Sequence, residues 1–110
     1  TLTFDTQAQA VVYLTANQAA NRIINFSNVN SNMAIGESMT FAVLATQGST
    51  PYYLNAYYID GTAGWSGVLK WQGGAAPTAG NASGIDAYSF TIIKTADATF
   101  TVLASVTQYA

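Results

Sequence analysis

The acidic side chains are the residues of this sequence best suited to chemistry. A pair of carboxylates roughly 5 to 9 Å apart can hydrolyse glycosidic bonds, and Asp60 and Asp86 are the pair to consider. Each stands where local structure favours aspartate: Asp60 precedes Gly61 in a strong turn dipeptide, and Asp86 stands at the start of a strand-like segment. Turn chemistry accounts for both better than catalysis. We therefore expect no catalytic residue and no enzymatic activity.

Metal and cofactor chemistry lacks its usual donors. The chain has no cysteine and no histidine, so thiolate ligands, disulfides and an imidazole base are excluded. Calcium requires only carboxylate and carbonyl oxygens, but the five acidic residues are not clustered in the sequence. We expect neither a metal nor a cofactor.

Charge and hydropathy also limit the classes of partner that the sequence supports. The net charge is −2, and the three cations (Arg22, Lys70 and Lys94) are scattered, so the basic patch typical of nucleic-acid binding is missing. No apolar run approaches the ~18 residues of a membrane span. The sequence predicts neither a nucleic-acid partner nor a membrane segment.

Aromatic residues raise a second possibility, because the flat face of a sugar stacks on exposed rings. The candidate glycan contacts are Trp65, Tyr53 and Tyr57. Trp65 is flanked by glycines, which indicates a loop tip, and loops on rigid scaffolds often carry function. Trp71 follows an apolar segment and precedes a double glycine, so burial at a corner of the core is the better interpretation for that residue.

The composition indicates one domain, residues 1–110, that associates with copies of itself. Only 7% of the residues are charged, against about 25% in an average globular protein, and half of them are hydrophobic. A surface with so few charges favours association. Because the sequence starts at Thr1 rather than methionine, we expect it to be a fragment or a processed product.

The elements that would position these residues are strands. Alternation of apolar and polar residues, β-branched content and turn signals at roughly ten-residue spacing predict an all-β fold, an antiparallel β-sandwich or jelly roll with no helix longer than two turns. The expected strands are 2–5, 11–15, 22–26, 37–46, 52–60, 68–71, 87–94 and 99–109. The segment from Ala8 to Ala20 is ambiguous, since its alanines and glutamines favour helix, but we interpret its centre as a strand.

Two details of the 52–60 segment can be checked against a structure. Alternation places Tyr53, Tyr57 and Ile59 on one face and Leu54 on the other, so both faces are apolar and we expect both to be covered. The turn 48–51 before this segment has the length of a hairpin connection.

Three ordered groups of residues, with two further segments downstream, carry a family resemblance. The groups are Arg22-Ile23-Ile24-Asn25-Phe26-Ser27-Asn28-Val29; Gln47-Gly48-Ser49-Thr50-Pro51-Tyr52 with Asn55-Ala56 and Ile59-Asp60-Gly61; and Leu69-Lys70-Trp71-Gln72-Gly73-Gly74 with Ala76-Pro77-Thr78. The downstream segments are Ile85-Asp86-Ala87-Tyr88-Ser89-Phe90 and Phe100-Thr101-Val102-Leu103-Ala104-Ser105. The sequence resembles the β-rich module at or near the C-terminus of tail-fibre-like virion structural proteins of tailed phages, most closely those of T4-like phages that infect marine cyanobacteria. The stretch 61–71 departs from this pattern by a few extra residues that include Trp65.

The resemblance implies a non-enzymatic structural module of the virion that forms a homotrimer. Its implied partners are other virion proteins and a glycan of the host surface. Two alternatives stay open: a capsid decoration or cement protein, and a carbohydrate-binding module of a secreted protein.

Overall fold

The computed structural model describes residues 2–63 and 67–109, and within them the regular structure is almost entirely strand. The elements are β1 (Leu2–Asp5), β2 (Val11–Leu14), β3 (Arg22–Ser27), β4 (Ser38–Thr46), β5 (Leu54–Ile59), β6 (Thr62–Ala63), β7 (Gly67–Trp71), the 3₁₀ turn η1 (Gln72–Gly74), β8 (Ile85–Ala96) and β9 (Thr99–Tyr109). The predicted all-β fold is confirmed. The described residues form no α-helix, and the 8–20 segment contributes a strand as predicted.

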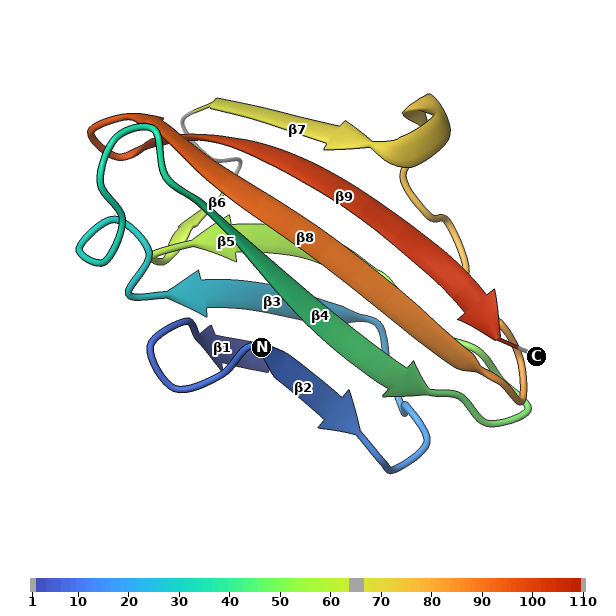
Figure 1. Cartoon of the computed structure of the whole chain (residues 1–110). Coiled ribbons are helices and arrows are strands. Elements are labelled where there is room, and N and C mark those ends of the chain that lie inside the picture. The colour runs from blue at the N-terminus through green and yellow to red at the C-terminus, as the bar shows by residue number, and fades with distance from the viewer. Residues whose placement is uncertain (1, 64–66, 110) are drawn as a thin grey trace.

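The strands form two sheets that lie face to face around one core (Figure 1). A four-stranded sheet has the order β1-β3-β5-β6, and a five-stranded sheet has the order β2-β4-β8-β9-β7. The long strands β4, β8 and β9 stand together in the five-stranded sheet. The fold therefore consists of two β layers with one buried interface between them.

The first five strands alternate between the two sheets, and this alternation sets their direction. Because the chain crosses to the other sheet and then returns, every second strand runs the same way, and the pairs β1–β3, β3–β5 and β2–β4 are parallel. The pair β7–β9 is also parallel, while β4–β8, β8–β9 and β5–β6 are antiparallel. The prediction of antiparallel pairing throughout is thus wrong.

The turn after β4 also differs from the prediction. Residues 48–51 do not close a hairpin, since they carry the chain from β4 in one sheet to β5 in the other. By contrast, the Asp60–Gly61 dipeptide does form the predicted turn between β5 and β6, with Ile59 paired to Thr62. Both turn residues have positive φ, 50° for Asp60 and 79° for Gly61, the combination found in tight two-residue hairpins.

A bulge in β5 changes which of its residues face the core. The register with β3 slips by one residue after Leu54, and Asn55 is left without a partner. Leu54 and Ile59 are both buried, and Tyr57 packs against the same core. The predicted placement of Leu54 opposite Ile59 is wrong, because one extra residue shifts the alternation by one position.

Phenylalanines from both sheets form the centre of the core. Phe4 of β1 lies 5.3 Å from Phe26 of β3 and 5.1 Å from Phe41 of β4, measured between ring centroids. Phe90 of β8 completes the group at 5.2 Å from Phe26. Burying each ring stabilises the fold by roughly 1.5–3 kcal/mol, so this aromatic group is the principal contact that holds the sheets together.

The long connection between β3 and β4 has little regular structure, and two charged side chains satisfy its backbone. The Asp60 carboxylate accepts hydrogen bonds from the amides of Val29 and Asn30, both at 2.9 Å. The Lys94 ammonium donates to the carbonyl oxygens of Asn30 and Met33, also at 2.9 Å. Lys94 is only 7% exposed, so at this end of the fold both charges serve loop structure.

Candidate interaction surface

The two aspartates considered for catalysis lie at opposite ends of β5. Asp60 directly follows the last residue of β5. Asp86 lies near the other end of this strand, because Gln47 is hydrogen-bonded both to Asp86 and to Tyr52, and Tyr52 precedes the strand. Six strand residues at about 3.3 Å each separate the two carboxylates by roughly 20 Å. This is well beyond the spacing of a glycosidase pair, so the structure does not bring them into one site.

Asp86 is a buried carboxylate with a structural set of contacts. It is 1% exposed, and its Oδ2 accepts hydrogen bonds from Gln47 Nε2 and from the amide of Asn81, both at 3.0 Å. These bonds hold the loop before β8 against the end of β4. Among residues 2–63 and 67–109, no three or more acidic side chains come together in a way that could hold a metal ion.

Tyr57, a predicted glycan contact, packs into the core. Its ring centroid lies 5.4 Å from that of Trp71 and 5.7 Å from that of Phe90. Its hydroxyl donates to the carbonyl of Leu54, and burial raises its pKa above the ordinary value. The geometry of Tyr57 is that of a core residue.

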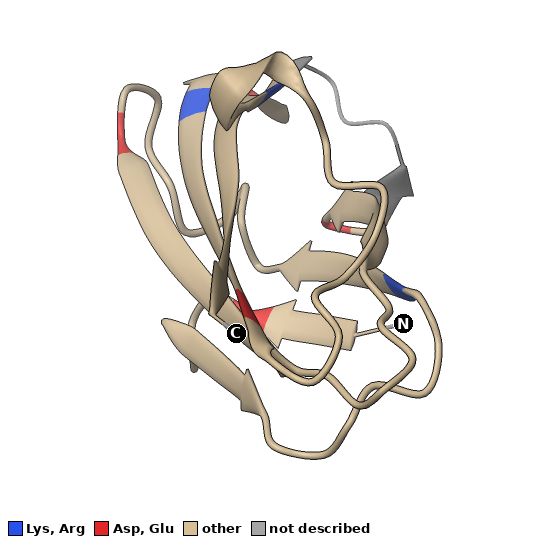
Figure 2. Cartoon of the chain, turned by 90° about the vertical axis from the view of Figure 1, so that its right-hand side faces the viewer, with Lys and Arg blue, Asp and Glu red and all other residues tan. Residues whose placement is uncertain are grey.

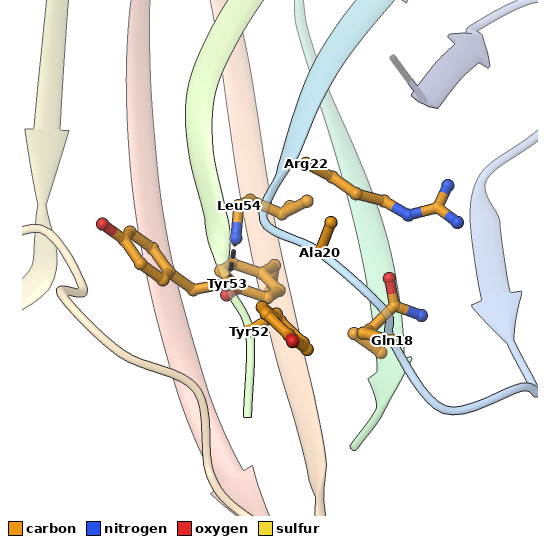
Figure 3. A pocket seen from close by; sticks show the side chains of 8 residues that line it. Gln18, Ala20, Arg22, Tyr52, Tyr53 and Leu54 are labelled. Carbon is orange, nitrogen blue, oxygen red and sulfur yellow. Dashed lines mark hydrogen bonds between the residues drawn. The ribbon is translucent and has the colours of Figure 1, made fainter. Parts of the chain in front are cut away.

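Tyr53, the second predicted contact, lines a small cavity between the sheets together with Tyr52, Gln18 and Arg22 (Figure 3). The ring of Tyr53 extends away from Tyr52 and Gln18. The cavity volume is about 10 Å³, which is room for about one water molecule and not for a sugar ring. Tyr53 and Tyr57 therefore do not form one platform for a glycan.

Of the two tryptophans, only Trp71 can be placed, because Trp65 lies outside the described residues. Trp71 is half-buried, and its ring also contacts Phe90 edge-on at 6.2 Å. The chain turns immediately after it through η1, where Gly73 and Gly74 have φ of 76° and 83°. The predicted corner is present, and the ring is only partly enclosed by it.

The outer face of the five-stranded sheet is the surface that the sequence analysis missed. Along β4, β8 and β9, every residue on this face is uncharged. These residues are Ser38, Thr40, Ala42, Leu44 and Thr46; Ile85, Ala87, Ser89, Thr91, Ile93 and Thr95; and Thr99, Thr101, Leu103, Ser105, Thr107 and Tyr109. Their alternation with buried core residues assigns them to one side of the sheet. Figure 2 shows the few charged positions scattered over the fold, with long uncharged lengths of strand between them.

Exposed apolar side chains gather on this same face. Among the residues whose burial the structure describes, five large hydrophobic residues are exposed. Four of them belong to this face, namely Val11, Tyr13, Leu103 and Tyr109; the fifth, Ile35, lies in a loop. Leu103 is 48% exposed and lies near the middle of β9, the strand next to the edge strand β7, where it is paired with Lys70. A signal was available in the sequence: Leu103 interrupts a run of Thr and Ser on the polar side of the last strand.

A shallow groove of about 310 Å³ crosses the face beside β7. Its lining combines hydroxyl, amide and apolar groups with a single ammonium: Lys70, Trp71, Gln72, Ser89, Thr91, Leu103, Ala104 and Ser105. The groove is large enough for a protruding side chain or a sugar ring. It can make neutral hydrogen bonds as well as apolar contacts.

Fold and surface together define a class: an all-β protein of two packed sheets, one of which presents an uncharged and partly apolar outer face. No protein-family model matches the chain, and neither a curated protein nor a solved structure matches it. Within the described ranges no helix has the length and hydropathy needed to span a membrane.

Proposed function

We propose that this chain is a non-enzymatic structural module of a tailed-phage virion, part of a tail fibre or a related appendage, and that it works as a homotrimer. Its partners in the proposal are copies of itself, other virion proteins and a glycan of the host surface. The β-sandwich, jelly-roll-like architecture belongs to the same proposal. Two stacked sheets support that architecture, and the parallel pairs are a departure from an antiparallel jelly roll.

The observation that carries the proposal is the outer face of the five-stranded sheet, which is uncharged along β4, β8 and β9 and has Lys70 of β7 as its one described charge. A soluble monomer ordinarily covers such a face with mixed charges, whereas this face has Thr, Ser, Ala and exposed aliphatic side chains. The ordered sequence motifs that resemble the phage fibre modules support the same role.

Two experiments test the proposal. Sedimentation equilibrium at micromolar concentration should give three times the 11.5 kDa mass of the chain, and a monomer at all concentrations would refute the homotrimer. Antibodies raised against the domain should label the fibres of particles made from the genome that encodes it. Labelling over the capsid would instead support a decoration protein, and unlabelled particles would overturn the virion assignment.

The groove favours a second candidate, a carbohydrate-binding module. Ser89, Thr91 and Ser105 present hydroxyls beside Leu103, a lining able to bond sugar hydroxyls. Glycan-array binding by a monomeric protein, lost in Ser105→Arg, would favour this candidate over the structural module. An oligomer without glycan binding would exclude it.

A further inference from the structure

The outer face of the five-stranded sheet is distinguished from all other described surface by its combination of size, exposure and lack of charge. We propose that a second copy of this chain packs on this face and that the exposed side chain of Leu103 lies within the contact. The inference rests on the homo-oligomeric role proposed above and adds which surface makes the contact.

The distribution of apolar side chains separates this face from the outer face of the other sheet. The four-stranded sheet carries Asp5 on its outer side and has no exposed large hydrophobic residue among the described positions. On the five-stranded sheet, the only charge among the described outward residues is Lys70, in the edge strand β7. Centres of protein interfaces are depleted in charge in the same way.

The area of the face is adequate for a stable contact. Strands spaced about 4.8 Å apart, with a rise of about 3.3 Å per residue, give the five strands a plan area of roughly 600 Å². The accessible surface of the side chains on this face is larger than this plan area. A standard interface buries about 800 Å² on each partner, so this face can supply most of one.

Electrostatics favours a copy of the chain as the occupant. Copies of this face carry Lys70 as their one described charge, at the edge strand β7, so they can meet with little like-charge repulsion. The net charge of −2 per chain adds only weak repulsion at long range. Hydroxyl groups of Thr and Ser on both faces can form hydrogen bonds in either sense, as donor or acceptor. The face therefore suits contacts with other copies of the chain arranged around the three-fold axis of a trimer, whereas it offers a charged partner protein few groups to pair with.

A matched pair of charge substitutions tests the inference. Leu103→Asp places a carboxylate on the face, at an exposed apolar position in β9, and Ile35→Asp places one at a loop residue that is 66% exposed and lies off the face. Leu103→Asp should weaken self-association, measured by sedimentation equilibrium, by about tenfold or more, while Ile35→Asp should associate like the wild type. Circular dichroism confirms that both variants fold. Unchanged association of Leu103→Asp in a folded protein, or equal weakening by both variants, refutes the inference.

A labelling experiment tests the same face without disrupting it. Because the chain has no cysteine, Leu103→Cys and Ile35→Cys each introduce a single thiol. In the associated protein a bulky maleimide should react at least about tenfold more slowly with the thiol at position 103 than with the one at position 35. On dilution to monomer the two rates should approach each other. If the wild type associates but the thiol at position 103 reacts at the faster rate throughout, the choice of face is wrong while the homo-oligomeric role stands; a wild type that never associates removes both.

Discussion

Replacing Lys94 by methionine tests whether the ammonium of this side chain holds the loop between β3 and β4. The substitution keeps an unbranched side chain of similar length and removes the charge. Lys94 is 7% exposed, and its two described acceptors are the carbonyls of Asn30 and Met33. After the substitution both carbonyls lose their donor.

The expected loss follows from opposing terms. Two hydrogen bonds from a charged donor contribute roughly 1.5–3 kcal/mol each, a gross total of roughly 3–6 kcal/mol. Methionine does not have the desolvation cost of a buried ammonium, which is typically several kcal/mol, and the removal of this cost offsets part of the loss. We expect the first term to win, because the carbonyls of Asn30 and Met33 lose the donor that the structure describes for them, with a net loss of about 2 kcal/mol in the free energy of unfolding.

Lys70→Met is the control, because the Lys70 side chain is exposed and its ammonium makes no hydrogen bond to a described residue. That variant should change stability by less than about 0.5 kcal/mol. Urea unfolding with an unchanged slope measures the difference, and the melting temperature of Lys94→Met should fall by about 8 °C. All proteins are compared at one concentration, since association shifts apparent stability. If Lys94→Met is as stable as Lys70→Met, the desolvation cost of the Lys94 ammonium equals the stabilisation from its two hydrogen bonds. The loop then does not depend on this ammonium.

Three further predictions concern the core, the alkaline limit and a hairpin. Trp71→Ala should cost about 3 kcal/mol, because the half-buried ring packs on Tyr57, whereas Gln72→Ala at the exposed neighbour should change the melting curve little. Burial raises the pKa of Tyr88 to about 12, and it raises that of Tyr57 as well. The stability gained by keeping these two hydroxyls neutral is therefore intact below the unfolded pKa of about 10 and is lost as pH rises from 10 toward 12. Tyrosinate absorbance from Tyr88 should appear in the folded protein only near pH 12, and ionisation of both rings near pH 10 in the folded protein would contradict the assigned burial. Ala98 has φ of 51°, which glycine adopts without strain, so Ala98→Gly should stabilise the protein by about 0.5 kcal/mol in thermal melts; a loss of stability there would show that the turn is unstrained.

The sequence by itself determined the type and approximate bounds of eight of the nine strands in the described residues, and it missed only the short strand β6. Alternation is a local property, since successive side chains in a strand point to opposite sides. It therefore identified the buried side of β4, where Phe41, Val43 and Ala45 are enclosed. The Asp60–Gly61 turn was equally predictable, because aspartate and glycine are the residue types that adopt positive φ in tight turns.

The tertiary structure alone decided how the strands pair and which side of a sheet remains uncovered. Alternation gives each strand two sides, but it does not say whether the next strand returns in the same sheet or crosses to the other. The parallel pairs among the first five strands come from crossing. The bulge after Leu54 and the exposure of Leu103 likewise depend on neighbours distant in the sequence. A local pattern records only adjacent residues, whereas pairing and exposure are set by contacts between segments that the whole fold brings together.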